Sequence, residues 1–187
     1  MTSGVQPGEM VILAARPSMG KTSFLLNIAE HMAVVEKRPV GVFSLEMSKA
    51  QLTQRFLASH AQFNLRQMRR GAISEEDWRA LNDAAARLHD APIYIDDAAL
   101  LTPLQLRAKA RRLHAAHDIE CIFIDYLQLM AYGGRSGTPR HEQITEISRA
   151  IKALARELGI PVIAAAQLNR GPTDRPTHRP RMSDLRE

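Results

Sequence analysis

The sequence predicts an α/β fold whose mostly parallel sheet carries helices on both faces. Short apolar runs alternate along the chain with segments whose apolar residues recur at helical spacing. The runs are nearly continuous in apolar residues, which is typical of strands buried on both faces. Strands that alternate with helices in this way favour parallel pairing, because each helix returns the chain to the same end of the sheet.

The predicted strands share apolar, β-branched or aromatic residues and cover 10–14, 40–44, 93–95, 121–124 and 161–166. The predicted helices share apolar residues three and four positions apart and cover about 21–35, 48–62, 74–88, 102–117 and 144–158. Their apolar positions are Phe24, Leu25, Ile28, Met32, Leu52, Phe56, Leu57, Trp78, Leu81, Leu88, Ile144, Ile147, Ile151, Leu154 and Leu158.

Capping residues justify the helix boundaries. Ser48 is a good N-cap, and residues 74–77 form a capping box. Thr102 precedes a proline at the first helical position, and Gly159 ends the last helix. The basic segment 64–71 shows no such signals, so we expect it to be irregular, with Arg66, Arg69 and Arg70 on a solvated face. The proline-rich tail from Asn169 is predicted to be a loop.

Composition limits the class of protein. The 187 residues, 45% hydrophobic and 24% charged, suit one globular domain over 1–187. The net charge of +5 permits a polyanionic partner such as nucleic acid. A single cysteine, Cys121, excludes an internal disulfide and a cysteine-built zinc site, which favours a reducing, cytoplasmic setting. The chain lacks both the ~18 consecutive apolar residues of a membrane span and the pattern of a signal peptide, so we expect no membrane partner.

The stretch from Met10 to Phe24 carries the clearest functional signal. A strand, a loop ending in Gly-Lys-Thr and a helix form the context of a phosphate-binding loop. Backbone N–H groups and the helix N-terminus bind phosphate oxygens there, with Lys21 as a mobile charge and the Thr22 hydroxyl as a Mg²⁺ ligand. The usual motif opens with glycine, whereas this chain has alanine. The predicted nucleotide-binding residues are Ala15, Arg16, Pro17, Ser18, Met19, Gly20, Lys21, Thr22 and Ser23.

Sites in parallel α/β sheets form beyond the carboxyl ends of the strands. That rule selects the loop above together with Glu46, Asp96-Asp97, Asp125 and Gln167. Asp125 suits a Mg²⁺ ligand, or else a strand-end cap. Glu46 suits the base that polarises the attacking water, or else an ordinary solvated carboxylate. Gln167 suits a γ-phosphate sensor or a satisfier of backbone groups. For Asp96-Asp97, capping the helix that begins near Thr102 is favoured over a second metal site.

Two basic loops are candidates for nucleic-acid contact. Arg135 and Arg140 lie in the glycine-rich segment 133–140, and the tail carries further arginines. The sequence leaves open whether these residues contact DNA or solvent.

Several strings, taken in order, resemble the helicase domain of the DnaB-type replicative DNA helicases. They are ARPSMGKT, FSLEMS, IFIDYLQLM, AAQLNR and RPRMSDLRE, and the resemblance covers essentially the whole chain. The alanine at the start of the phosphate loop matches that family's own variant. The resemblance implies a RecA-like P-loop ATPase that uses ATP and Mg²⁺.

Carried over by position, Lys21 and Thr22 bind the phosphates and Mg²⁺, and Asp125 is the second acidic motif. Glu46 resembles the family's catalytic base and Gln167 its γ-phosphate sensor. Residues 184–187 are similar to the start of its single-strand DNA-binding loop, which adds Arg186 and Glu187 to the DNA-contacting candidates.

The resemblance also implies a homo-hexameric ring that encircles single-stranded DNA and unwinds duplex DNA. Primase and the helicase loader would be met through parts outside this chain. We expect an amino-terminal collar domain before it, and the final strands with the arginine finger after it. The isolated chain is therefore expected to bind Mg-nucleotide weakly and to hydrolyse it poorly.

Two alternatives remain at this point. One is a RecA-like recombination or repair ATPase, which FSLEMS and SDLRE disfavour. The other is a nucleotide-binding regulatory scaffold with a protein partner, which the basic loops disfavour. Stimulation of ATP hydrolysis by single-stranded DNA separates a motor from a scaffold.

Overall fold

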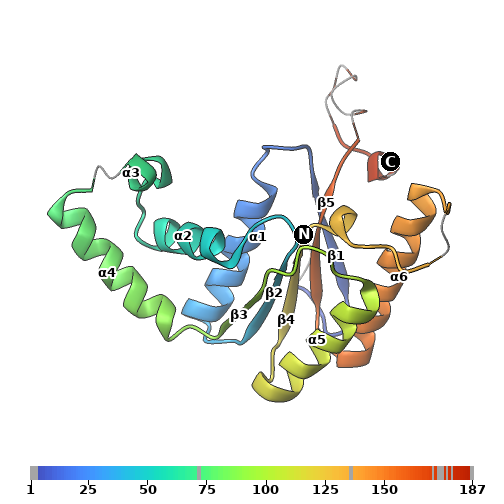
Figure 1. The fold of residues 1–187 in the computed structure, drawn as a ribbon, viewed down its shortest axis with the longest axis horizontal. Coiled ribbons are helices and arrows are strands. Elements are labelled where there is room, and N and C mark those ends of the chain that lie inside the picture. The colour runs from blue at the N-terminus through green and yellow to red at the C-terminus, as the bar shows by residue number, and fades with distance from the viewer. Residues whose placement is uncertain are drawn as a thin grey trace.

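A five-stranded parallel sheet forms the centre of the molecule (Figure 1). The computed structural model describes residues 4–70, 73–134, 137–169, 171, 175, 177 and 179–185. The strands are β1 Met10–Ala15, β2 Val40–Ser44, β3 Ile93–Asp96, β4 Cys121–Asp125 and β5 Val162–Gln167. They lie in the order β1-β5-β4-β2-β3, and every neighbouring pair is parallel. The predicted α/β class and all the predicted strands are confirmed.

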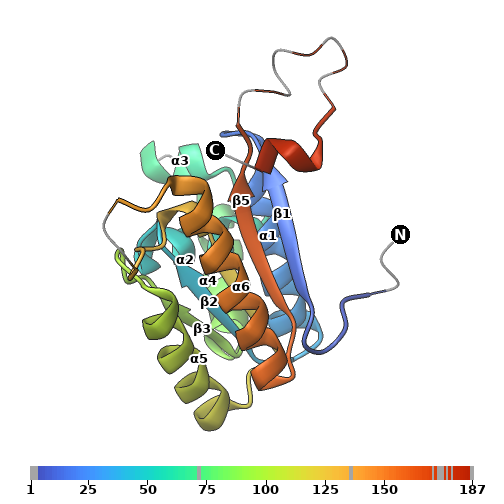
Figure 2. The same cartoon turned by 90° about the vertical axis from the view of Figure 1, so that its right-hand side faces the viewer.

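Helices cover both faces of this sheet (Figures 1 and 2). Those of the described residues are α1 Lys21–Glu30, continued by a π-helical turn at His31–Val35, α2 Lys49–His60, α3 Leu65–Arg70, α4 Glu75–His89, α5 Pro103–His117 and α6 Arg140–Leu158. Helices α1 and α2 pack on one face, α5 and α6 on the other. Helix α4 contacts α2 and projects away from the sheet (Figure 1).

Successive side chains of the central strand β4 point to opposite faces of the sheet and so belong to two separate core layers. Ile122 and Ile124 pack with the residues of α5 and α6, whereas Cys121 and Phe123 pack with those of α1 and α2. All four side chains are at most 1% exposed. Full burial of such apolar side chains contributes roughly 1.5–3 kcal/mol each, which explains why these strands read as continuous apolar runs.

The helix boundaries follow the predicted capping chemistry. Ser48, Ser74 and Thr102 each form a capping box at the start of α2, α4 and α5. Gly159 ends α6 in the left-handed conformation, with φ +65°. These local signals therefore placed the starts of α2, α4 and α5 and the end of α6 correctly, whereas α6 begins at Arg140, earlier than predicted.

Two predictions about the helices were wrong. Segment 64–71 contains the short helix α3, which begins where the Asn64 side chain accepts a hydrogen bond from the Arg66 amide. Among the apolar positions at helical spacing, Phe24 and Trp78 are 56% and 58% exposed. Asp97 does not cap α5; its carboxylate accepts from the Lys49 amide at the start of α2.

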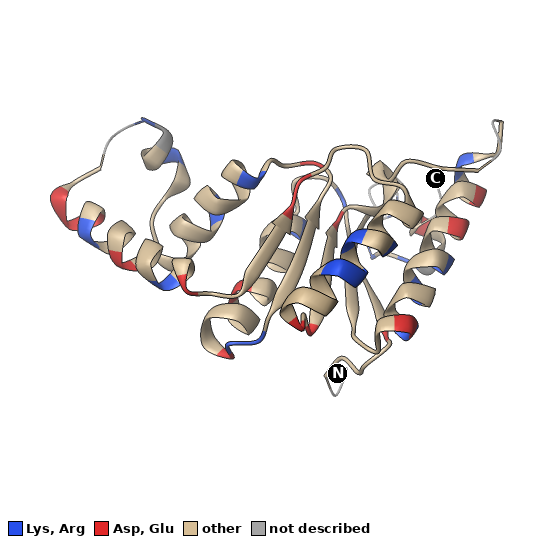
Figure 3. Cartoon of the chain, turned by 60° about the horizontal axis from the view of Figure 1, so that its bottom comes forward, with Lys and Arg blue, Asp and Glu red and all other residues tan. Residues whose placement is uncertain are grey.

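Charge is spread over the surface with both signs. Figure 3 shows acidic and basic residues interspersed along the helices, while the strands carry few charges. No helix of the described residues is long and apolar enough to cross a membrane. The carboxyl ends of the parallel strands share one edge of the sheet, where Ala15, Ser44, Asp125 and Gln167 come together.

Candidate active site

The loop between β1 and α1 leaves a helix N-terminus open. Gly20 occupies the N-cap position with φ +85° and ψ +13°, and no side chain of the described residues caps the helix. Helices α2, α4 and α5 each have a complete capping box. The first N–H groups of α1 therefore remain available, and they lie at the positive end of the helix dipole, which favours an anion.

A pocket of about 380 Å³ lies beside this loop. Its lining joins the loop to the ends of β2, β4 and β5 and to helix α2. The lining residues are Arg16, Pro17, Ser18, Gly20, Lys21, Thr22, Ser23, Glu46, Met47, Arg55, Tyr126 and Gln167.

Asp125 lies beneath the loop at the end of β4 and is 1% exposed. The Thr22 hydroxyl donates to Asp125 Oδ2 over 2.7 Å, and Lys21 Nζ lies 3.8 Å from Asp125 Oδ1. Within the described part of the chain, Oδ1 is buried without a hydrogen-bond partner. A buried carboxylate oxygen beside a threonine hydroxyl is the kind of hard oxygen set that Mg²⁺ takes, together with phosphate oxygens.

The environment of Lys21 is mixed. Burial lowers the pKa of its ammonium below the ordinary value, while the carboxylates of Asp125 and Glu46 act in the opposite direction. Lys21 Nζ also lies 3.9 Å from the centre of the Tyr126 ring. The contacts with the Tyr126 ring and the Asp125 carboxylate hold the Lys21 ammonium beside the loop, in a place suited to a phosphate group.

Glu46 lies on the turn after β2 and lines the pocket with an exposed side chain. The Ser44 hydroxyl donates to the Met47 carbonyl over 2.7 Å and accepts from the Met47 amide, while the Leu45 amide donates to the Asp125 carbonyl. These bonds fix the turn that presents Glu46.

Gln167 ends β5 and lines the same pocket. On one side, β5 pairs with β1, where Ala15 is opposite Gln167. On the other side, the buried side chain of Gln128 pairs with the Gln167 backbone. The Arg16 guanidinium donates to the neighbouring Leu168 carbonyl over 3.0 Å, so the loop and this strand end are joined directly.

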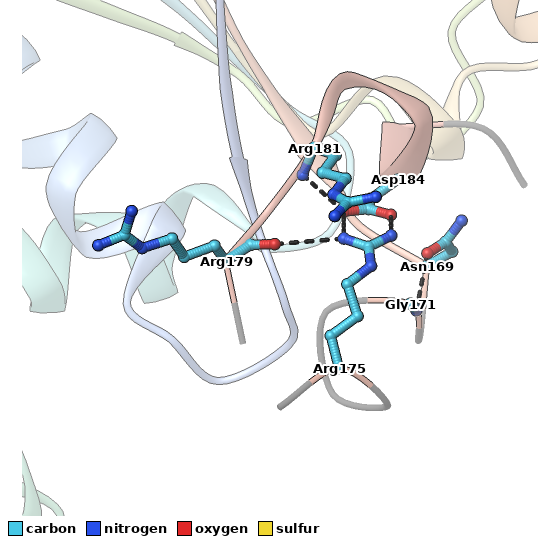
Figure 4. A network of polar contacts seen from close by, with 6 residues as sticks. All are labelled: Asn169, Gly171, Arg175, Arg179, Arg181 and Asp184. Carbon is cyan, nitrogen blue, oxygen red and sulfur yellow. Dashed lines mark hydrogen bonds and ion pairs between the residues drawn. The ribbon is translucent and has the colours of Figure 1, made fainter. Parts of the chain in front are cut away.

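The chain after β5 folds back through a buried ion pair (Figure 4). Asp184, 2% exposed, accepts two hydrogen bonds from the Arg175 guanidinium and one from the Arg181 amide. Its own carbonyl accepts from the Asn169 amide over 2.9 Å. The hydrogen bonds from Arg175 hold the pKa of the Asp184 carboxyl below its usual range. The Asn169–Asp184 hydrogen bond thus joins the two ends of the segment predicted as a loop, which contains a 3₁₀ turn at Met182–Leu185.

Most of the predicted site residues converge at this edge. Of the loop, Ala15 lies at the end of β1 and Met19 is 74% exposed, and neither lines the pocket. Arg140 is half-buried, with its guanidinium bonded to the Gln128 carbonyl and the Gln143 side chain. Arg135, Arg186 and Glu187 lie outside the described residues.

Sequence reasoning missed four residues at the site. Tyr126 directly follows Asp125, and Met47 directly follows Glu46, so adjacency to a predicted residue was an available signal. Arg55 comes from the middle of α2, and its NH1 donates to the Ser23 hydroxyl over 3.3 Å. The Gln128 side chain is hydrogen-bonded to the backbone of Gln167, 39 positions away. For these two, no local pattern in the sequence indicates the role.

The whole chain, residues 1–187, matches the family model of the DnaB-like helicase C terminal domain. It is 50% identical over 189 residues to the replicative DNA helicase DnaB of a Nostoc species, and 48% identical over 187 residues to that of Geobacillus stearothermophilus. All of this chain is covered, but it spans only 21% and 41% of the lengths of those relatives.

Two solved structures share the fold over the whole chain, each with a TM-score of 0.93 and 35% identity. One is described as an ATPase domain, of which 66% is covered. The other is described as a DnaB-like replicative helicase and its interactions with primase, of which 45% is covered.

Proposed function

The chain belongs to the family of DnaB-like helicase C-terminal domains, and we propose that it is the ATP-hydrolysing motor of a replicative DNA helicase. Membership of this family implies nucleotide binding. The match over the whole chain favours this reading over the recombination ATPase and the regulatory scaffold that the sequence left open.

One observation carries the proposal. An uncapped helix N-terminus, the paired Lys21 and Asp125, and the side chains of Glu46 and Gln167 all meet at one pocket. In this scheme the loop amides and Lys21 bind the β- and γ-phosphates of ATP. Because the fold holds these groups around one pocket, less reorganisation is needed in the transition state.

Thr22 and Asp125 are the residues that would hold Mg²⁺. Asp125 Oδ1 is buried and accepts no hydrogen bond from the described residues, and the threonine hydroxyl is bonded to Oδ2, so the two side chains fit a small oxygen-seeking cation. When bound, the ion neutralises charge on the phosphate oxygens. Among the described residues no cluster of three or more acidic, histidine or cysteine side chains could hold a metal, which suits an ion that takes its other ligands from phosphate and water.

Glu46 is proposed as the base that polarises the attacking water. Its side chain lines the pocket on a turn fixed by Ser44, and a carboxylate there is suited to accept a proton from an attacking water. Gln167 is proposed to sense the γ-phosphate, because a neutral amide can donate to a phosphate oxygen and respond to its loss.

The partners are also proposals. We propose that the motor binds single-stranded DNA and moves along it, and that its active assembly is a homo-hexamer. Primase and a helicase loader are proposed as partners of a longer protein that contains this chain. One of the similar structures is described with its interactions with primase, which supports that class of partner. Because the chain is similar to replicative helicases of bacteria such as Geobacillus stearothermophilus, we propose a cytoplasmic location. Arg135, Arg140, Arg186 and Glu187 remain the candidates for DNA contact.

The test is a chimera in which this chain replaces the matching 187 residues of the Geobacillus stearothermophilus relative. We expect ATP hydrolysis that single-stranded DNA stimulates, and duplex unwinding that requires ATP. The Lys21→Ala chimera is the matched control and should show neither activity. An assembled chimera whose hydrolysis ignores single-stranded DNA would contradict the motor and favour a regulatory scaffold.

A further inference from the structure

The end of β5 is held by a side chain where its neighbouring strand has already turned away. The ladder between β4 and β5 runs from Ile122↔Val162 to Ile124↔Ala164. Beyond Asp125 the chain leaves the sheet and forms a 3₁₀ turn at Leu127–Leu129. The N–H and C=O of Gln167 therefore have no strand opposite them on that side.

Gln128 takes the place of the missing strand. Its Nε2 donates to the Gln167 carbonyl over 2.9 Å, and its Oε1 accepts from the Gln167 amide over 3.1 Å. The other edge of β5 is held by β1, where the Leu168 amide donates to the Ala15 carbonyl. The backbone at Gln167 is thus fixed from both sides.

The chemistry of this contact requires a primary amide. Gln128 is 8% exposed and must accept and donate at once, which glutamine does and glutamate, methionine or leucine does not. An apolar side chain here would leave two backbone groups at the pocket edge without their partners, and buried backbone groups are costly to leave unpaired.

Gln128 is itself held in place. The Arg140 guanidinium donates to the Gln128 carbonyl and, over 2.8 Å, to the Gln143 side chain. The Gln143 amide donates in turn to the Thr138 carbonyl over 2.8 Å. A continuous set of hydrogen bonds therefore joins the loop before α6 to the end of β5.

We propose that Gln128 is the positioning residue for Gln167. By fixing the Gln167 backbone, Gln128 directs the Gln167 side chain toward the terminal phosphate of the bound nucleotide. Arg140 acts as the support of Gln128 within this network. The inference rests on the proposed function, because it takes Gln167 to be the residue that distinguishes a triphosphate from a diphosphate. It predicts that losing Gln128 affects triphosphate binding and spares diphosphate binding.

The test measures dissociation constants of the chimera described above, with its unaltered form as the wild type, in the presence of Mg²⁺ for two fluorescent nucleotides, ADP and a non-hydrolysable ATP analogue. Gln128→Met removes both hydrogen bonds, and Gln128→Glu keeps the acceptor but loses the donor. Gln167→Ala removes the sensor itself. Gln54→Met, at an exposed position of α2, is the matched control.

We expect the wild-type chain and Gln54→Met to prefer the triphosphate. Gln128→Met and Gln167→Ala should each reduce that preference by about tenfold, the scale of one hydrogen bond to a charged group, while ADP affinity stays within about twofold. Gln128→Glu should reduce it in the same direction. Thermal melting is recorded for each variant, and Gln128→Glu carries the test if the methionine variant does not fold.

The possible failures are distinguishable. If Gln167→Ala loses the preference and both Gln128 variants keep it, the positioning role is overturned and the proposed function stands. An equal loss of ADP and triphosphate affinity in the Gln128 variants would assign Gln128 a general structural role and also overturn it. If Lys21→Ala binds both nucleotides as well as the wild type, the proposed function fails and the inference fails with it.

Discussion

Replacing Gly20 by alanine should lower both the stability of the protein and its affinity for nucleotide, and comparison with a second glycine separates these two effects. Gly20 has φ +85°, and a Cβ added there would meet no heavy atom within 4 Å. Its energetic cost in the free protein is therefore the backbone term alone, roughly 1–2 kcal/mol for an L-residue in the left-handed region. For a domain of this size that lowers the melting temperature by roughly 2–8 °C.

Gly159→Ala is the matched control. Gly159 has φ +65° and an equally empty Cβ position, but it lies at the end of α6, where β5 begins, at the opposite edge of the sheet. Calorimetry should show similar losses of stability for both variants. A titration with fluorescent ADP should show a loss of affinity of about tenfold or more for Gly20→Ala alone. The alanine relieves its strain by moving away from positive φ, and the loop then no longer directs its amides at phosphate. Unchanged affinity in Gly20→Ala would refute the loop as the phosphate site.

Further substitutions and conditions test the other groups. In the chimera, Lys21→Ala should abolish tight binding of fluorescent ATP, and equal affinity of mutant and wild type would exclude its role as phosphate ligand. In the chimera, Glu46→Gln should retain ATP binding but slow hydrolysis by ~10²–10⁴-fold; near wild-type turnover would move the base elsewhere. Burial raises the pKa of the Cys121 thiol to about 12, so DTNB should not label the native protein at pH 8 but should label it in denaturant. Rapid native labelling would contradict this burial. Because the Asp184 pKa is lowered by Arg175, the ion pair contributes stability above the ordinary aspartate pKa of about 3.9. That stability is lost as the pH falls through the lowered pKa, and Asp184→Asn should abolish this part of the acid transition.

The parts of the site that depend on local sequence were predictable. The strand, the loop with its Gly-Lys-Thr and the helix are contiguous, so their meaning is read without knowledge of the fold. Glu46, Asp125 and Gln167 each follow an apolar run, and parallel strands bring their carboxyl ends to one edge. That geometrical rule, applied to the sequence alone, selected residues that line or lie beneath the pocket.

What the sequence could not show depends on contacts between distant segments. Asp97 was assigned to the nearest following helix, but its carboxylate binds the first amide of α2, 48 positions earlier. The sequence analysis placed Arg140 in a basic, glycine-rich loop, yet Arg140 begins α6 and its guanidinium binds the Gln128 carbonyl. Helix α3 was missed because six residues hold too few apolar positions for a periodic signal, although Asn64 was an available start signal.

A crystal structure of the chain with Mg²⁺ and a non-hydrolysable ATP analogue would locate the nucleotide directly. We expect the terminal phosphates against the amides of 20–22 and Lys21 Nζ, with the ion beside Thr22 and Asp125. A second pocket, of about 360 Å³, contains Met32 and Pro161 and lies at the opposite edge of the sheet. A nucleotide bound there, with the loop before α1 unoccupied, would contradict the account.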